Sequence, residues 1–294
     1  MKRVILKIKY GFGNQLYEYA CAYAIAKREN RELHMDLSFY DGEGLQGHEV
    51  YLLDQLKIEK TPVFRESRLQ KSKNLILKIA AKAEALIRRG GRCAYYSVWS
   101  PQEYKKIDLK DEKRNVYLEG WFQSYKYFED CEEDIRRMFQ PAFQVTDQMR
   151  KWMDQIKTMP NSTSLHIRRG DYITDYGSAV GTNYYEQAIE YIKSFDKDTH
   201  FYVFSDDIEW AKENIKHENL HFVSDGSMNM LEEFFVMSSC KNQIITNSSF
   251  SWWAAWLNGN EKKIVIAPCI EKSKAGSWRK ESYPESWYTI DAVM

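Results

Sequence analysis

Residues 164–172 read Ser-Leu-His-Ile-Arg-Arg-Gly-Asp-Tyr, an apolar run that ends in two arginines, a glycine and an aspartate. We interpret the run as a β-strand with a charged site at its carboxyl end. A guanidinium offers only N–H donors, so two of them side by side suit a doubly ionised diphosphate. In a regular strand Arg168 and Arg169 would point to opposite faces, so a shared site requires a turn near Gly170. The alternative, a solvated strand end in which the arginines pair with Asp171, stays open on these residues alone.

The rest of the second half alternates strands with helices. Strands are expected at 199–205, 220–223, 243–246 and 263–267, and helices at 184–194, 208–216, 230–240 and 252–257. This alternation predicts an α/β fold with a parallel sheet and right-handed crossovers. Ligands of such folds bind at the carboxyl ends of the strands, so polar residues that follow each strand are the candidates for the site.

Two further strand ends carry such residues. Asp206 and Asp207 follow the strand expected at 199–205, and we expect one acid to bind a ribose or a purine and the other to cap the next helix. Asn247, Ser248 and Ser249 come directly before a helix. The amides and the dipole at a helix start suit a phosphate, although a plain serine cap would also explain these residues.

The first half opens as a βα unit, with a strand at 4–8, a glycine loop at 10–15 and a helix at 16–29. The loop lacks the third glycine of a dinucleotide fingerprint and the lysine of a Walker motif. A glycine turn before a helix still brings backbone amides to the carboxyl end of a strand, where Asn14 and Gln15 would be the polar contacts.

Other residues of the first half lie at comparable positions. Asp36 ends the strand expected at 32–36, either as a turn aspartate or as a functional acid. Gln123 and Ser124 lie at the polar tip of the strand expected at 116–125, and we consider them as contacts for the acceptor substrate.

A helix is expected at 126–139 and another at 146–158. Breakers at 160–163 follow, so we divide the chain into domains 1–158 and 159–294.

Residues 71–92 form a basic amphipathic pattern. Apolar side chains recur at helical spacing among seven lysines and arginines, with Glu84 as the one acid. A helix that packs its apolar stripe on the domain core would give this pattern. A helix that lies on an anionic membrane surface would give it too, and both interpretations stay open.

The length and composition of the chain exclude several classes of protein. The 294 residues suffice for two domains, and 42 basic residues balance 42 acidic ones, so net charge predicts no nucleic-acid partner. Five scattered cysteines favour reduced thiols in the cytoplasm, and no signal peptide or membrane span is expected. Asp196-Lys197-Asp198 matches a metal-binding D-x-D string but precedes a strand. No metal is therefore predicted, and the arginines would carry the leaving-group charge instead.

Four blocks of the chain resemble fucosyltransferases. Residues 166–172 resemble their H-x-R-R-x-D motif, and residues 11–20 resemble the G-x-G-N-Q-x-F-x-Y-A opening of the α1,2-fucosyltransferases, glycosyltransferase family 11. Residues 120–128 and 247–257 are similar to two more blocks of that family. One departure is Phe12, which stands between Gly11 and Gly13 where the family has a second glycine. We expect little consequence, since the turn should need mainly Gly13.

The resemblance implies a GT-B architecture, two Rossmann-like domains with the active site in the cleft between them. It also implies inverting transfer of L-fucose from GDP-β-L-fucose, without a metal or other cofactor, to the 2-hydroxyl of a galactoside. The acceptor would be a galactose-containing glycan or a lipid-linked oligosaccharide, as in O-antigen biosynthesis, and the enzyme would be cytoplasmic or peripheral at the inner face of the membrane. A transferase for another nucleotide sugar and a silent binding protein remain the alternatives.

Residue roles carried over by motif complete the expectation. Arg168 and Arg169 would hold the diphosphate and stabilise the departing GDP. The other donor contacts would be Asn14, His166, Asp206, Asn247, Ser248, Ser249 and Phe250. The general base is open between Asp171 and Asp36, and an arginine partner would make Asp171 a poor proton acceptor.

Overall fold

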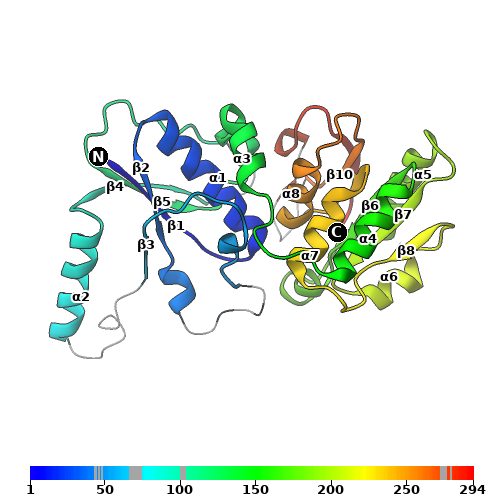
Figure 1. The fold of residues 1–294 in the computed structure, drawn as a ribbon, viewed down its shortest axis with the longest axis horizontal. Coiled ribbons are helices and arrows are strands. Elements are labelled where there is room, and N and C mark those ends of the chain that lie inside the picture. Colours follow the sequence, from blue (N-terminus) through cyan, green and yellow to red (C-terminus); the bar gives the residue numbers. More distant parts are fainter. Residues whose placement is uncertain are drawn as a thin grey trace. The chain divides into compact units, whose positions relative to one another are not determined.

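The computed structural model describes residues 1–42, 45, 47, 49–65, 75–99, 104–271, 277–278 and 280–294, with the backbone alone at 77, 78 and 88. The chain forms two compact units, Met1–Ala142 and Phe143–Met294. Each contains a parallel sheet with helices between its strands (Figure 1). The α/β class and the two Rossmann-like halves expected from the sequence are therefore confirmed.

The first unit is built on a five-stranded parallel sheet in the order β3-β2-β1-β5-β4. Its strands are β1 (Arg3–Lys7), β2 (Glu32–Asp36), β3 (Val63–Phe64), β4 (Cys93–Val98) and β5 (Asn115–Gly120), and its α-helices are α1 (Phe12–Arg28), α2 (Leu75–Arg88) and α3 (Glu132–Met138). Val4, Ile5 and Leu6 of the central strand are fully buried, as are Leu16 and Ala20 of α1. Burial of this apolar surface joins α1 to the sheet.

The second unit is built on a six-stranded parallel sheet in the order β11-β10-β9-β6-β7-β8. Its strands are β6 (Ser162–Ile167), β7 (His200–Ser205), β8 (Leu220–Phe222), β9 (Asn242–Ile244), β10 (Val265–Cys269) and β11 (Tyr288–Asp291). Its α-helices are α4 (Asp147–Thr158), α5 (Thr182–Lys193), α6 (Ile208–Asn214), α7 (Met230–Ser239) and α8 (Ser249–Leu257), and a π-helical turn, η6, spans Tyr172–Tyr176. The central strand β6 is buried along its whole length.

The domain boundary lies earlier than the expected division at 158. The structure divides the chain after Ala142, so α4 belongs to the second unit. Thr146 caps α4 and also donates a hydrogen bond to Glu232 of α7, and the ring of Trp152 lies edge-on to Tyr202 of β7. These contacts attach α4 to the second sheet. The proline and asparagine after the helix mark only the turn into β6 and no domain border.

Two local expectations in the first unit also change. The helix α1 begins at Phe12, so Gly13 and Asn14 lie in its first turn rather than in a loop. The left-handed residue before the helix is Tyr10, with φ of 62°, and Gly13 is a buried helical residue. The expectation that the turn needs mainly Gly13 is therefore wrong, because the left-handed position is Tyr10. Of the helix expected at 71–92, residues 75–88 are helical, 71–74 lie outside the described residues, and 93–98 form strand β4.

Candidate functional site

Three polar segments meet at the carboxyl edge of the second sheet. Strand β6 lies between β9 and β7, with Ile167 opposite Ser205 and Leu165 opposite Ile244. Because all three strands are parallel, the residues that follow them emerge at the same edge. These are the segments 168–171, 206–207 and 245–249. The sheet topology thus brings together the clusters that the sequence singled out in its second half.

The chain turns directly after β6, and Asp206 holds the turn. Its carboxylate accepts the backbone N–H of Arg169 at 2.8 Å and that of Gly170 at 3.1 Å. A Cβ atom at position 170 would lie 2.9 Å from Oδ2 of Asp206, too close without a shift. A larger residue at position 170 would therefore displace this carboxylate. The predicted turn exists, and the carboxylate that holds it belongs to the residue directly after the neighbouring strand β7.

Arg168 lies between two carboxylates. Its Nε donates to Oδ1 of Asp171 at 2.8 Å, and its Nη1 lies 3.2 Å from Oδ2 of Asp206. Burial alone would lower the pKa of Arg168, but the bonds to Asp171 and Asp206 raise it above its usual value. The guanidinium is consequently a permanent cation. Its Nη2 makes no hydrogen bond to a protein acceptor within the part of the chain that the structure describes, which leaves that nitrogen for an anion.

Arg169 is held by a different set of contacts. Its Nε lies 3.3 Å from Oδ2 of Asp207, and its guanidinium carbon lies 3.8 Å from the centre of the Trp210 ring. Oδ1 of Asp207 also accepts the N–H of Trp210 and so caps α6. Asp207 is thus the helix cap that one of the two acids was expected to be, while the nucleoside contact of the other stays a prediction. Trp210 was not selected from the sequence, because nothing at its position on α6 signals that an arginine from β6 will stack on it.

His166 is buried beneath the turn. It is 5% exposed, its ring centre lies 5.7 Å from that of Phe250, and burial followed by the charge of Arg168 lowers the pKa of His166 to about 3. The imidazole is therefore neutral at physiological pH. A neutral ring can accept one hydrogen bond and donate another, which suits the nucleoside role expected for this residue.

The buried histidine predicts a specific pH dependence of stability. Because the folded pKa lies below the unfolded value, the unfolded chain binds a proton that the folded chain does not, and stability falls as the pH drops from about 6.5 toward 3. The contribution approaches about 1.4 kcal/mol per pH unit in that window. Urea unfolding of wild type and His166→Gln from pH 7 to pH 5 should show a shallower decline in the variant. Parallel slopes would contradict a buried neutral imidazole.

The start of α8 presents backbone amides at the same edge. Ser248 is the N-cap, and its Oγ accepts the N–H of Phe250 at 3.3 Å. Asn247 is fully buried, and its carbonyl accepts the hydroxyl of Tyr172. Tyr172 therefore connects the segment after β6 to the start of α8. Ser248 acts as the cap that was the plain alternative, while Ser249 is half-exposed in the first helical turn.

In the first unit, Asn14 lies at the start of α1 and Gln123 follows β5. Nε2 of Gln123 donates to Oδ1 of Asn14 at 2.7 Å, so two residues selected from separate motifs share one hydrogen bond. Gln15 has a structural role instead. Its buried amide binds the carbonyls of Tyr10 and Val50 and the N–H of Leu52, which attaches the 50–52 segment to α1. Ser124 is 2% exposed.

Asp36 is buried at the end of β2. Its carboxylate accepts the hydroxyl of Tyr117 at 2.6 Å and the N–H of Ser38 at 3.0 Å, and it lies 3.4 Å from Nη2 of Arg89. Burial and the nearby Asp36 raise the pKa of Tyr117, so the phenol stays protonated and donates. The contacts give Asp36 a structural role at the end of α2. As a general base it would first have to give up these partners.

A half-buried acid, Glu233, and a fully buried one, Glu18, were missed by the sequence reasoning. Glu233, in the first turn of α7, accepts from Ser224 at 2.7 Å, and Ser224 in turn accepts the N–H of Ser205 at the end of β7. Glu18, fully buried on α1, accepts the N–H of Lys9 at 2.9 Å. Burial raises the pKa of both carboxyls. The apolar spacing of a helix gives no sign of an acid on its inner face, so only the structure shows them.

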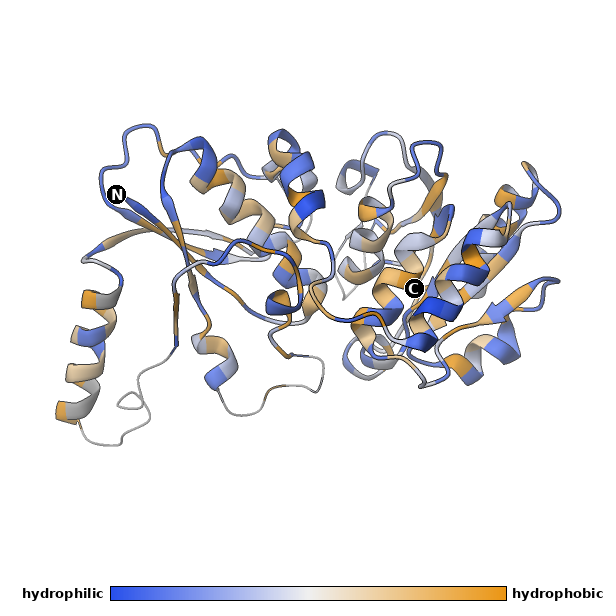
Figure 2. Ribbon diagram, in the orientation of Figure 1, coloured by the Kyte–Doolittle hydropathy of each residue, from blue (hydrophilic) through white to orange (hydrophobic). Residues whose placement is uncertain are grey.

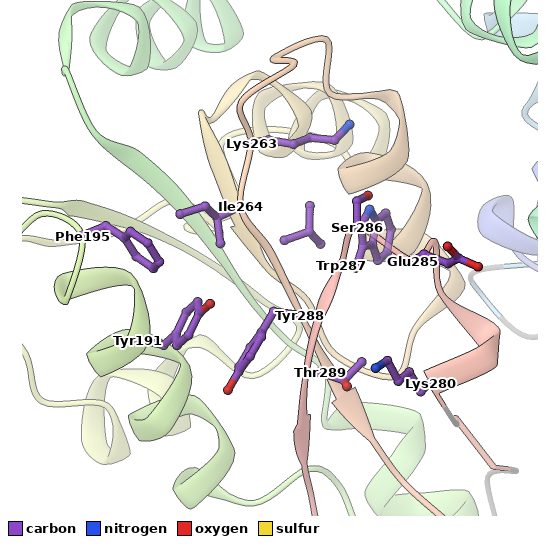
Figure 3. A pocket seen from close by; sticks show the side chains of 11 residues that line it. Tyr191, Phe195, Lys263, Ile264, Lys280, Glu285, Ser286, Trp287, Tyr288 and Thr289 are labelled. Carbon is purple, nitrogen blue, oxygen red and sulfur yellow. The ribbon is translucent and has the colours of Figure 1, made fainter.

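A pocket of about 490 Å³ lies elsewhere on the second unit (Figure 3). It is lined by Val265 and Tyr288, where β10 and β11 begin, and by Tyr191 of α5, whose ring stacks on Tyr288 at 4.1 Å. This is the amino edge of the sheet, opposite the arginines. The ammonium of Lys263 in its wall donates to the carbonyl of Asn258 at 2.7 Å. We therefore do not place the diphosphate in this pocket.

The D-x-D string lies in a turn. Oδ1 of Asp196 accepts the N–H of Asp198 at 2.9 Å just before β7, at the amino edge as expected. Within the described ranges no group of three or more histidine, cysteine, aspartate or glutamate side chains is placed to hold a metal ion.

Comparison with known proteins assigns the chain. Residues 3–291 match the model of glycosyl transferase family 11. The chain belongs to this family. It is 32% identical to an alpha-1,2-colitosyltransferase of Escherichia coli, with 99% of this chain and 100% of the relative covered, and 30% identical to the O-antigen biosynthesis glycosyltransferase WbnK of Escherichia coli, with 95% and 98% covered. It is 26% identical to human galactoside alpha-(1,2)-fucosyltransferase 1, with 85% and 64% covered.

Among solved structures, this family 11 glycosyltransferase resembles the fucosyltransferase NodZ from Bradyrhizobium. The TM-score is 0.53 at 14% sequence identity, with 86% of this chain and 92% of that chain covered. At this identity the likeness concerns the fold alone. It agrees with two Rossmann-like units of the GT-B class, and the expected fold class is confirmed.

Proposed function

We propose that this glycosyltransferase transfers L-fucose from GDP-β-L-fucose to the 2-hydroxyl of a galactoside, with inversion to an α1,2 linkage and without a metal. The observation that carries the proposal is the meeting of Arg168, Arg169 and the start of α8 at one sheet edge, in a chain of family 11. These are the groups that a departing nucleoside diphosphate requires.

The chemistry follows from where charge develops. Cleavage of the anomeric C–O bond leaves negative charge on the diphosphate and positive character on the sugar. Nη2 of Arg168, the Nη groups of Arg169 and the amides at the start of α8 would bind the oxygens of the leaving group. Neutral His166 and Asp206 would contact the guanosine. The acceptor hydroxyl must lose a proton, and Asp171 and Asp36 remain the candidates for the base.

Asp171 is a weak candidate by its surroundings. Its Oδ1 accepts a hydrogen bond of 2.8 Å from Nε of Arg168, so this arginine already occupies one of the two carboxylate oxygens. Asp36 has a tyrosine, an arginine and a backbone amide as partners. Either could act only after its partners rearrange on substrate binding.

A nucleotide-linked colitose is the second candidate donor, because a relative at 32% identity is named a colitosyltransferase. Colitose differs from L-fucose by the absence of the 3-hydroxyl. A site that hydrogen-bonds that hydroxyl would reject colitose strongly, whereas an apolar site would discriminate weakly. We place fucose first because the matched motifs are those of fucosyltransferases.

The assay that tests the proposal measures product by mass spectrometry with a panel of galactosides. GDP-fucose, GDP-colitose and GDP-mannose are compared as donors, each with EDTA and with added Mg²⁺. We expect turnover with GDP-fucose, none with GDP-mannose, and the same rate in EDTA. A higher rate of product formation with GDP-colitose than with GDP-fucose would show that colitose is the sugar transferred. A strict divalent-ion requirement would refute the role of the arginines as the replacement for a metal, and tight GDP binding without product would favour a silent binding protein.

The partners proposed with this function are GDP-fucose and a galactose-containing glycan or lipid-linked oligosaccharide, handled in the cytoplasm. The relative named for O-antigen biosynthesis supports a glycan of that kind. An acceptor built on a lipid carrier would bring the reaction to the inner face of the membrane.

A further inference from the structure

Helix α2 directs its bulky apolar side chains to solvent. Leu75, Ile79, Leu86 and Ile87 are 71%, 59%, 47% and 77% exposed, whereas Ala81 is fully buried. At 100° per residue the four exposed side chains occupy an arc of about 120° on one side of the helix. Among the α2 side chains that the structure describes, the buried one is the small Ala81, and these four large apolar ones face solvent.

The position of α2 within the first unit agrees with an apolar side that faces solvent. In Figure 1, α2 stands apart from the sheet of its unit and leads into strand β4, and Figure 2 shows hydrophobic positions along the helix. An apolar surface of this extent in water is unfavourable and marks an interaction surface in folded proteins. The core-packing interpretation of the sequence pattern is wrong for these four side chains.

The end of the helix is anchored. Arg89, directly after α2, lies 3.4 Å from Asp36, stacks on Tyr117 with 4.4 Å to the ring centre, and donates to the hydroxyl of Tyr95 at 2.8 Å. Burial alone would lower the pKa of Arg89, but Tyr117, Tyr95 and Asp36 raise it. This cation joins the carboxyl end of α2 to strands β2, β4 and β5.

Charge indicates what covers the arc. Residues 71–92 carry one acid, Glu84, and the basic residues Lys71, Lys73, Lys78, Lys82, Arg88, Arg89 and Arg92, in a chain whose net charge is zero. Exposed Lys82 lies next to the arc, about 20° beyond Leu75. Positive charge beside an exposed apolar face matches a surface that is anionic outside and apolar below.

We propose that α2 binds the surface of an anionic lipid bilayer. The apolar arc would enter the boundary between headgroups and acyl chains, and Lys82 beside it would lie at the level of the lipid phosphates. With 14 residues α2 is about 21 Å long, shorter than the roughly 30 Å of a bilayer core. No helix among the described residues has the length and hydrophobicity to cross a membrane. The helix would thus lie along the surface, and the proposal stands independently of the donor sugar.

Vesicle flotation of the purified full-length chain tests the proposal. Vesicles of phosphatidylcholine are compared with vesicles rich in phosphatidylglycerol. We expect binding to the anionic vesicles that weakens with added salt. The double variant Ile79→Ser with Leu86→Ser should lower the bound fraction at least about tenfold, since two buried aliphatic side chains are lost from the bilayer. Lys82→Glu should lower it less.

The matched control is Phe195→Ser, which removes a side chain that is 63% exposed on the second unit. It should bind vesicles like the wild type, and thermal unfolding should show that all variants remain folded. Absence of flotation, equal binding by the double variant, or equal binding to neutral vesicles would overturn the proposal. So would a concentration-dependent dimer in size-exclusion chromatography that the double variant abolishes, because a second copy would then cover the arc.

Discussion

Replacing Arg169 with lysine should lower kcat at least about a hundredfold, in the range seen when a transition-state donor is deleted. Lysine keeps the charge but loses the planar group that lies 3.8 Å from the centre of the Trp210 ring and the Nε that contacts Asp207. Its compact ammonium can bind one phosphate oxygen where the guanidinium offers a fork. Steady-state kinetics with GDP-fucose, together with GDP release, measures the effect.

The control for this substitution is Arg150→Lys. Arg150 lies on α4 in the same unit, pairs with Asp147 at 3.3 Å, and has a side chain that is 59% exposed. It should keep wild-type turnover. Near-normal turnover in Arg169→Lys would remove this residue from the diphosphate site. A large loss in the same variant with an unchanged melting temperature would show that the defect is in catalysis and not in folding.

Replacing Asp206 with alanine should damage both stability and activity. The N–H groups of Arg169 and Gly170 lose their acceptor, and Arg168 loses one of the two carboxylates that it contacts among the described residues. The groups are partly exposed, so we expect a loss of about 1–2 kcal/mol in the free energy of unfolding, with a fall of at least about tenfold in kcat/KM as the arginines move. Denaturant unfolding and kinetics measure the two effects.

This outcome separates two roles of the carboxylate. If Asp206 only contacted guanosine, as its motif implies, the variant would unfold like the wild type and lose GDP affinity alone. Asp198→Ala is the control, since it removes an exposed acid from the turn before β7. Gly170→Ala gives an independent check, because its Cβ would press on the same carboxylate oxygen. If the Gly170→Ala variant had the stability and turnover of the wild type, the contact between Asp206 and this turn would be weaker than its hydrogen-bond distances indicate.

Most strands and helices could be predicted because their buried faces have a regular period. Three strands were missed: β3, β4 and β11 lie at or next to sheet edges, are only partly buried, and so lack a clear apolar pattern. The start of α1 was misplaced for another reason. Glycine is a poor helix former, yet burial in the fold keeps Gly13 helical, so local propensity loses to packing.

Some features of the candidate site could likewise be predicted from the sequence, and others could not. The positions of Arg168, Arg169, Asp206 and Ser248 at strand ends follow from an alternation that is visible along the chain. The outward direction of the apolar face of α2 could not be decided this way, because a core helix and a surface-binding helix have the same spacing. Its exposed leucines and isoleucines become apparent only once the rest of the unit is in place.

Order and spacing along the chain predict the α/β class, the motifs of family 11 and the sheet edge at which the charged residues gather. Which groups each of these residues contacts depends on how the chain folds in three dimensions. Asp206 accepts hydrogen bonds from the turn after β6, Arg169 stacks on Trp210, and Arg89 contacts Asp36. Each contact joins segments that are distant in sequence and adjacent in the fold. Such neighbours are selected by the burial of the whole core, and no local pattern records them.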